Sequence, residues 1–211
     1  MDLTRPLAVV TPTVDADVLA VLAGASASFT GRQVHRLIGR HSERGVRNTL
    51  QRLCAQGVVK RTRVGSADQY VLNRSHLASP YIESLANLRA ELLQRVREEF
   101  ALWRLPAEYA ALFGSSARGD MRVESDIDLF VVRPSSVDGE NDMWQEQMSA
   151  LVANVTAWTG NDTRVLEMDV NEVKKGLAAE EDVLMDIRDQ GLALIGPSRY
   201  LCRDDSGRQN G

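Results

Sequence analysis

The sequence is poor in the features that mark secreted, membrane-spanning or metal-rich proteins. Its two cysteines, Cys54 and Cys202, have no metal-like spacing, and Cys54 falls on the apolar face of an expected helix, where a reduced structural thiol is the usual finding. The three histidines, His35, His41 and His76, also lack the spacing of metal ligands. No apolar run approaches the ~20 residues that cross a bilayer, and the N-terminus has no basic flank of the kind that begins a signal peptide. We therefore expect a cytoplasmic protein with no membrane partner.

The overall charge conceals an uneven distribution along the chain. The 211 residues carry a formal net charge of -4, with 44% hydrophobic and 26% charged residues, as in soluble globular proteins. Residues 31–74 contain ten Lys and Arg against two acids, whereas residues 101–211 contain eleven Lys and Arg against twenty acids. This length and this separation of charge predict two small domains with different functions.

Helix and hairpin signals run through the basic half. Thr30 and Gln33 have the spacing of a capping box, and the apolar stripe that follows residue 43 predicts a further helix that ends at Gly57. The segments VVKRTRV and QYVLN predict two short strands joined by a tight turn. With an earlier helix over residues 16–22, the order is three helices and then a hairpin, which resembles a winged helix-turn-helix domain.

That resemblance implies a third helix in the major groove of DNA and a hairpin that acts as a wing. Arg, Asn and Gln side chains can pair with base edges, and cations on the wing would meet phosphates. We therefore expect double-stranded DNA as a partner, contacted by Arg44, Arg47, Asn48, Gln51, Lys60, Arg61 and Arg63. The alternatives are a solvated basic face on a helical packing module and a winged helix that binds protein.

A long helix is expected to connect the two halves. Ser79 and Pro80 have the pattern of a helix start with proline at its first position, and an apolar stripe then continues for about 23 residues, roughly 34 Å at helical rise. The stripe consists of Ile82, Leu85, Leu88, Leu92 and Val96. Such a stripe more often packs into a core, but it also offers a seam for a homodimer.

The acidic half contains the stretch FGSSARGDMRVESDIDLFVV, residues 113–132. A short apolar run ends at Gly114, and ten residues after the Gly-Ser-Ser turn two aspartates, Asp126 and Asp128, begin a second run. On a strand, residues two apart share a face. Two neighbouring carboxylates repel each other unless a cation lies between them, and oxygen ligands suit Mg²⁺, which keeps waters and substrate phosphates as further ligands. The turn could supply backbone N–H groups and a hydroxyl to those phosphates.

The spacing of these residues resembles the signature of the DNA polymerase β-like nucleotidyltransferases, and within them the minimal, antitoxin-like type. The resemblance covers about residues 101–195. It implies an α/β (α+β) fold with a mixed sheet, a site for Mg²⁺ and a nucleoside triphosphate, and transfer of a nucleotidyl group to a hydroxyl or phosphate. Carried onto this chain, it implies nucleotide binding by Gly114, Ser115, Ser116 and Arg118, and metal binding and catalysis by Asp126, Asp128 and Glu167.

The third carboxylate is the least determined member of that set. The family needs one on a later strand, and the segment DTRVLEMDV is the best candidate. Val165, Glu167 and Asp169 share one face of this expected strand. In the family the acid lies about four residues before the next helix, which favours Glu167, and Asp169 remains the alternative.

The resemblance also suggests what the protein acts on. It implies transfer of a nucleotidyl group, with AMP from ATP favoured, to a protein acceptor such as a toxin-like partner, by an antitoxin-like protein that regulates its own operon through the DNA-binding domain. The alternative, from another class, is a transcriptional regulator whose nucleotidyltransferase domain only senses nucleotide; an intact carboxylate triad would argue for turnover. Modification of an antibiotic is a weaker third option, because no substrate domain follows.

The expected organisation follows from these segments. We predict a winged helix-turn-helix domain over residues 1–79, a connecting helix over 80–104, a nucleotidyltransferase domain over 105–200 and a disordered tail over 201–211.

Overall fold

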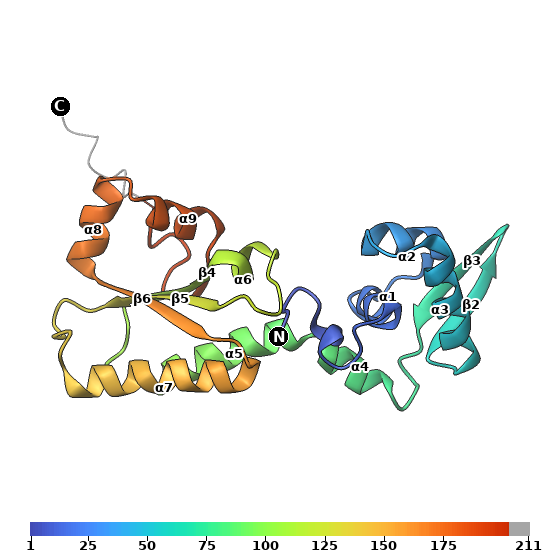
Figure 1. Ribbon diagram of the computed structural model, residues 1–211, viewed down its shortest axis with the longest axis horizontal. Coiled ribbons are helices and arrows are strands. Elements are labelled where there is room, and N and C mark those ends of the chain that lie inside the picture. The colour runs from blue at the N-terminus through green and yellow to red at the C-terminus, as the bar shows by residue number, and fades with distance from the viewer. Residues whose placement is uncertain (203–211) are drawn as a thin grey trace. The chain divides into compact units, whose positions relative to one another are not determined.

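The computed structural model describes residues 1–202, and the chain divides into two compact units (Figure 1). The N-terminal unit is Asp2–Ala90, and the C-terminal unit is Glu91–Gly211 together with Met1. The division falls within the segment 80–104 that was expected to connect the two halves. Within the described residues, no helix is both long enough and apolar enough to span a membrane.

The N-terminal unit packs helices against a small antiparallel sheet. Its strands run in the order β1-β3-β2, and β2 and β3 form the expected hairpin. The short strand β1, which pairs with β3, was not predicted. In chain order the elements are η1 (Pro6–Val9), α1 (Val14–Ala23), β1 (Phe29–Thr30), α2 (Gly31–Ile38), α3 (Glu43–Ala55), β2 (Val59–Val64) and β3 (Ala67–Leu72).

Local sequence signals account for the ends of α2 and α3. Thr30 and Gln33 form the predicted capping box at the start of α2. Gly39 ends that helix with a φ of 66°, a left-handed conformation that glycine adopts without strain. Ser42 then caps α3 by accepting a hydrogen bond from the backbone N–H of Gly45. The two helices bury their apolar faces in a common core with α1 and the sheet.

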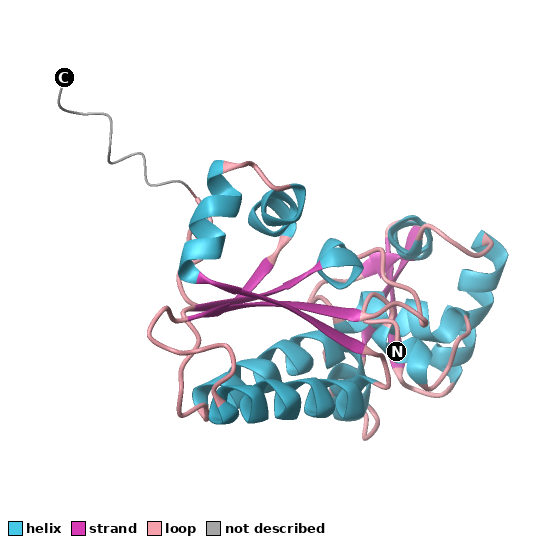
Figure 2. Cartoon of the chain, turned by 60° about the vertical axis from the view of Figure 1, so that its left-hand side comes forward, coloured by secondary structure: helices cyan, strands magenta, loops and turns pink. Residues whose placement is uncertain are grey.

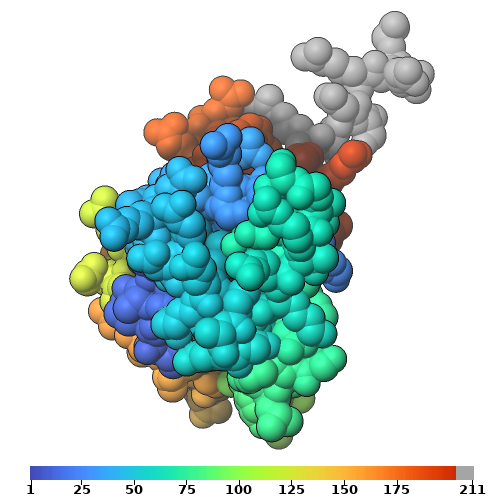
Figure 3. Space-filling model, turned by 90° about the vertical axis from the view of Figure 1, so that its right-hand side faces the viewer, coloured from blue at the N-terminus to red at the C-terminus, as the bar shows by residue number. Residues whose placement is uncertain are grey.

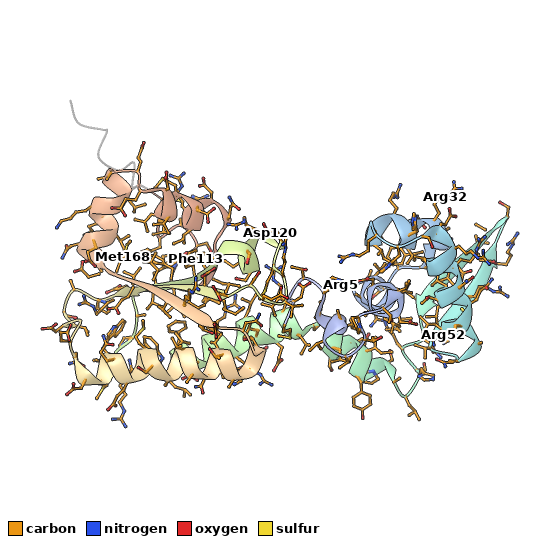
Figure 4. The ribbon with its side chains drawn as sticks, viewed as in Figure 1. Arg5, Arg32, Arg52, Phe113, Asp120 and Met168 are labelled. Atoms are coloured by element: carbon orange, nitrogen blue, oxygen red, sulfur yellow. The ribbon has the colours of Figure 1, made fainter. Side chains whose placement is uncertain are left out.

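A buried carboxylate joins α1 to the turn between α2 and α3. Asp17 is 8% exposed, and it accepts hydrogen bonds from both Nε and Nη2 of Arg5, at 3.1 and 2.8 Å. Figure 4 labels Arg5 beside α1. Nε2 of His41 lies 2.7 Å from the same carboxylate. Burial alone would raise the pKa of Asp17, but the hydrogen bonds from Arg5 and His41 outweigh it and hold the pKa below its ordinary value.

The expectation of a single long helix after residue 80 is wrong. The segment forms two helices, α4 (Ser79–Ala86) and α5 (Leu88–Ala101), separated at Asn87, where φ is -97° and ψ is 9°. Asparagine favours caps and turns over helix interiors because its side chain competes for backbone hydrogen bonds. The apolar stripe is also shared between two cores, since Ile82 packs on the core of the N-terminal unit and Val96 is buried in the C-terminal unit.

The C-terminal unit contains a four-stranded mixed sheet, as predicted. Its order is β6-β5-β4-β7, with β4 antiparallel to β5 and β7, and β5 parallel to β6. The strands are β4 (Tyr109–Phe113), β5 (Ile127–Arg133), β6 (Thr163–Asp169) and β7 (Leu192–Ile195). The helices that join them are α6 (Gly114–Arg118), α7 (Asp142–Thr159), α8 (Val170–Ala178) and α9 (Asp182–Gln190).

Helices cover both faces of this sheet. In Figures 1 and 2, α5 and α7 lie on one face, and α6, α8 and α9 lie on the other. On the α8–α9 face, Phe130 of β5 is buried with Val173 and Leu184. On the α7 face, Trp144 is fully buried and packs edge-on against Trp103 at 5.3 Å between ring centroids. The two central strands, β4 and β5, are therefore buried on both sides, which explains the nearly continuous apolar run of β5.

The predicted start of the disordered tail, at residue 201, is too early in the chain. Leu201 is 2% exposed and belongs to the core on the α8–α9 face, because its apolar side chain completes the packing around Tyr109 and Tyr200. Cys202 is exposed, and the remaining residues of the expected tail, 203–211, lie outside the described residues.

Candidate functional site

The turn at Gly114–Ser115, here called the Gly-Ser turn, lies directly against the start of β5. Phe113 pairs with Asp128 across the antiparallel strands β4 and β5, so the chain turns at Gly114 beside the Asp128 carboxylate. Gly114 has a φ of 66°, and a Cβ at this position would lie 2.4 Å from Oδ2 of Asp128. Glycine is therefore needed here both for the backbone conformation and for the close approach of the carboxylate.

Asp126 and Asp128, here called the aspartate pair, are held together in a partly buried position. Burial raises the pKa of Asp128, the charge of Asp126 raises it further, and attraction to Arg164 and Arg118 opposes both. Oδ2 of Asp126 lies 2.9 Å from Nη1 of Arg164. The charged form of Asp128, disfavoured by burial and by the neighbouring carboxylate, is one that a bound cation would stabilise.

A buried asparagine fixes the loop that leads into the aspartate pair. Asn161 is 4% exposed, and its Nδ2 donates hydrogen bonds of 2.9 Å to the carbonyls of Val123 and Ser125. The backbone N–H of Ile127 donates to the carbonyl of Asp162 at 2.8 Å. The loop is thereby joined to the start of β6. Sequence reasoning missed Asn161, because nothing in its neighbourhood indicates which distant carbonyls it contacts.

The residues after Gly114 differ in what their side chains can do. Ser115 is partly exposed next to the aspartate pair, whereas Ser116 is fully buried and its hydroxyl donates to the carbonyl of Phe113 at 2.9 Å. Ser116 therefore has a structural contact that the expectation of nucleotide binding did not include. Arg118 is exposed, and its guanidinium lies 3.4 Å from Asp186 and 3.6 Å from Asp120; Figure 4 labels Asp120 beyond α6.

The structure does not bring Glu167 to the aspartate pair. Its Oε1 accepts a hydrogen bond of 2.8 Å from Nε of Arg133 and one of 3.0 Å from the indole Nε1 of Trp144. Trp144 belongs to α7, on the face of the sheet opposite to α6. Glu167 thus serves as the acceptor for a buried indole, and the expected triad of Asp126, Asp128 and Glu167 is corrected on this point.

Glu167 faces away from the aspartate pair because of the register of β6 against β5. Asp128 is the partner of Arg164 in the parallel ladder, so the side chains on the face of Asp128 are Arg164, Leu166 and Met168. Leu166 and Met168 pack on the core beneath α8 and α9, and Figure 4 shows Met168 on that side of the sheet. Over Thr163–Asp169, every position on this face therefore carries a cation or an apolar side chain.

Asp169, the alternative third acid, caps a helix instead. Its Oδ1 accepts hydrogen bonds from the backbone N–H groups of Asn171 and Glu172, and the Glu172 side chain accepts from the Asp169 N–H in a capping box. The hydrogen bond from the Glu172 backbone lowers the pKa of Asp169. Its capping role explains the acid at this position without a metal.

The donor set around the aspartate pair suits a hard cation with few protein ligands. Within residues 1–202, no group of three or more His, Cys, Asp or Glu side chains is close enough to hold a metal ion. Two aspartates are nonetheless a fitting set for Mg²⁺, which commonly takes one or two carboxylates and completes its shell with waters and phosphates. Because Gly114 has no side chain, the Asp128 carboxylate can lie directly against the Gly-Ser turn.

The N-terminal unit presents its basic residues on α3 and β2. The side chains expected to contact DNA are all exposed, four on α3 and three on β2: Arg44, Arg47, Asn48 and Gln51, then Lys60, Arg61 and Arg63. Figure 3 shows α3 and the β2–β3 hairpin next to each other on one face of this unit. Arg52 on α3 instead pairs with Asp15 of α1, while Arg32, exposed on α2 and labelled in Figure 4, adds a cation that sequence reasoning did not single out.

Comparison with known proteins finds a family match in the acidic half. Residues 90–184 match the family model of the nucleotidyltransferase domain. A crystal structure of a toxin-antitoxin with AMP-PNP is 16% identical, with a TM-score of 0.35 over 53% of this chain and 76% of that chain. A crystal structure of a mutant of the toxin-antitoxin MntA-HpeT is 17% identical, with a TM-score of 0.36 over 51% of this chain and 75% of that chain. Likenesses of this size carry no argument about function, and no curated protein matches the chain.

The family match begins where the C-terminal unit begins, at residue 90 against Glu91, and contains the Gly-Ser turn, the aspartate pair and β6. Residues 90–184, rather less than half of the chain, thus match the nucleotidyltransferase domain family.

Proposed function

We propose that the C-terminal unit binds a Mg²⁺–nucleoside triphosphate at the aspartate pair and the Gly-Ser turn, and that its activity is nucleotidyl transfer. The observation that carries this proposal is the close approach of Gly114 to Asp128, which brings a carboxylate and a partly exposed turn of backbone together at one point. The family match over residues 90–184 supports the class of reaction.

In this proposal each part of the site has a separate task. Asp126 and Asp128 would hold the cation, and Ser115 with the backbone at Gly114 would bind the terminal phosphates of the nucleotide. The cation, when bound, would neutralise phosphate charge that develops as the bond to pyrophosphate breaks. Arg118, exposed at the end of α6, would attract the triphosphate into position.

The donor and acceptor rest on the family resemblance. We propose ATP as the favoured donor and a nucleotidyl group, AMP, as the group transferred. A hydroxyl oxygen of the acceptor would bond to the α-phosphorus, and pyrophosphate would leave. A protein is the acceptor that the minimal nucleotidyltransferase type implies, in the manner of an antitoxin acting on a toxin-like partner.

A second candidate is nucleotide sensing without transfer, and the position of Glu167 favours it. Transfer to a hydroxyl requires a group that accepts the acceptor's proton, and the only residue besides the aspartate pair for which the family resemblance implied catalysis was Glu167. Glu167 instead accepts hydrogen bonds from Arg133 and Trp144, and β6 turns a leucine, Leu166, toward the face of the aspartate pair. A site of this kind binds nucleotide as an effector without needing a base.

We further propose that the N-terminal unit binds duplex DNA as a winged helix. The support is its element order of three helices followed by a hairpin, with exposed Arg, Asn and Gln on α3 and exposed cations on β2. In that arrangement α3 would read base edges and β2 would contact phosphates. The chain would then link a nucleotide site to a DNA site, as an autoregulator or a nucleotide-responsive regulator does.

One assay separates transfer from sensing. The full chain is incubated with Mg²⁺, cell lysate and, in turn, ATP, GTP, CTP and UTP labelled at the α-phosphate. Transfer predicts a labelled macromolecule that is absent when the variant Asp126→Asn/Asp128→Asn replaces the wild type. If the chain binds nucleotide but none of the four nucleotides gives a labelled product, the transferase hypothesis is excluded and the sensing hypothesis is retained.

A further inference from the structure

Arg164 is a charged residue of the site that neither the family resemblance nor the proposed activity uses. In the ladder between β5 and β6 it is the direct partner of Asp128, and its side chain lies on the same face of the sheet. Its Nη1 is 2.9 Å from Oδ2 of Asp126. The strand that was expected to bring a third carboxylate to the aspartate pair therefore brings a guanidinium.

The environment of Arg164 leaves it free to change partner. Its side chain is 73% exposed, against 26% for Asp126, so an ion pair between them is stabilised by little more than screened attraction. The other guanidinium near the site, Arg118, instead lies close to Asp120 and Asp186, two acids outside the aspartate pair. Releasing Arg164 from Asp126 would thus cost little and would not disturb packing.

We infer that Arg164 neutralises the aspartate pair when no metal is bound and moves to the triphosphate when a Mg²⁺–nucleotide enters. This inference rests on the proposed nucleotide site and assigns a regulatory and binding role within it. Arg164 would keep the empty site from binding free divalent cation and would select the cation that arrives with a nucleotide.

The inference predicts effects of opposite sign for two ligands. A free divalent cation must approach the aspartate pair against the positive charge of Arg164, so removal of this charge should tighten its binding. A nucleoside triphosphate brings several negative charges, so removal of the same guanidinium should weaken its binding by a lost charge-assisted hydrogen bond. A residue that only supports the fold would shift both affinities in one direction.

The test uses the full chain with Arg164→Gln and with the charge-preserving variant Arg164→Lys. Free-cation affinity is measured by electron paramagnetic resonance with Mn²⁺ as the probe, and nucleotide affinity by calorimetry with Mg²⁺ and α,β-methylene-ATP, which blocks cleavage at the α-phosphate. For Arg164→Gln we expect Mn²⁺ to bind about two- to fivefold more tightly, the scale of an exposed ion pair. We expect the nucleotide to bind about tenfold more weakly, the scale of one hydrogen bond to a charged group.

Arg95→Gln is the matched control, because Arg95 pairs with Glu91 on α5, on the opposite face of the sheet. This variant should leave both affinities unchanged, and Arg164→Lys should restore most of the wild-type behaviour. The inference would be overturned if Arg164→Gln left both affinities unchanged or shifted them in the same direction. The proposed nucleotide site would still be supported in that case, provided that the wild type binds the nucleotide. A wild type that binds neither probe would overturn both.

Discussion

The indole Nε1 of Trp144 donates a hydrogen bond of 3.0 Å to Oε1 of Glu167, across the face of the sheet that lies away from the aspartate pair. This contact gives Glu167 a structural role in place of the catalytic role that its position in the sequence suggests. Because Trp144 is fully buried, its N–H has no access to bulk water if the carboxylate is removed. Leaving this donor unsatisfied would therefore lower the stability of the fold and would not affect the nucleotide site.

Glu167→Ala should therefore lower the free energy of unfolding by about 1–3 kcal/mol, the usual cost of a buried donor without its acceptor. Chemical denaturation measures this loss, and calorimetry should find Mg²⁺–nucleotide affinity within about twofold of wild type. Glu146→Ala, an exposed position on α7, is the control and should change stability by less than about 0.5 kcal/mol. If Glu167→Ala kept normal stability but no longer bound nucleotide, Glu167 would have to belong to the nucleotide site.

Gly114→Ala should remove nucleotide binding through strain and a clash with Asp128. A Cβ at residue 114 would lie 2.4 Å from a carboxylate oxygen, at a φ of 66°. Gly160→Ala separates the two effects, because Gly160 has a φ of 70° but a Cβ there would meet no atom within 4 Å. We expect the control to cost about 1 kcal/mol of stability from its backbone alone and to keep nucleotide affinity. Equal losses of affinity in both variants would contradict the account.

The loss of folding stability at acid pH should depend on Asp17. A carboxyl whose pKa is held below its unfolded value of about 3.9 contributes stability that is fully present above that pH and is lost as pH falls through the folded pKa. Asp17→Asn should thus lower the melting temperature most at neutral pH, with a gap from wild type that closes below about pH 4. Thermal unfolding between pH 7 and 2.5 measures the gap.

Asp68→Asn is the control for that series, since Asp68 pairs with Arg63 at the exposed hairpin, 3.3 Å away. A surface pair of this kind contributes at most about 1 kcal/mol, so its variant should follow the wild-type curve closely. A constant gap between Asp17→Asn and wild type at every pH would show that the ionised carboxylate is not what stabilises the contact with Arg5 and His41.

The basic face of the N-terminal unit should bind DNA in two distinguishable ways. Lys60→Ala and Arg61→Ala should weaken binding of all duplexes alike and reduce its salt dependence, because phosphate contacts release counterions. Arg47→Ala should instead reduce discrimination between a selected and a random duplex, by about 1–3 kcal/mol if Arg47 pairs with a guanine. Titrations at several salt concentrations measure both effects. A chain that ignores duplex DNA at low salt would leave this unit as a protein-binding module.

Local features of the fold were predictable from sequence. Capping signals, turn residues and strand periodicity depend on neighbouring residues. The capping box of Thr30 and Gln33, the turn at Gly114 and the strand that begins at Ile127 could therefore be predicted without tertiary information. The mixed sheet followed from the family resemblance, not from periodicity.

The failures of prediction from sequence share a physical cause. A period of two says that Glu167 and Asp169 lie on one face of β6, but the register against β5 decides which face that is, and one residue of register exchanges the faces. The break at Asn87 was hidden for a similar reason, since an apolar stripe can serve two cores. Arg164 was missed because the carboxylate with which it pairs is distant in sequence.

The most direct test of the account is the affinity for ATP, measured by calorimetry with and without Mg²⁺, in the wild type and in Asp126→Asn/Asp128→Asn. We expect the wild type to bind ATP only with Mg²⁺, and the double variant to lose this binding. Its melting temperature should stay the same or rise slightly, because burial and repulsion from Asp126, which both raise the pKa of Asp128, no longer act on a charged side chain. Unchanged, Mg²⁺-dependent ATP affinity in a folded double variant would contradict the proposed site.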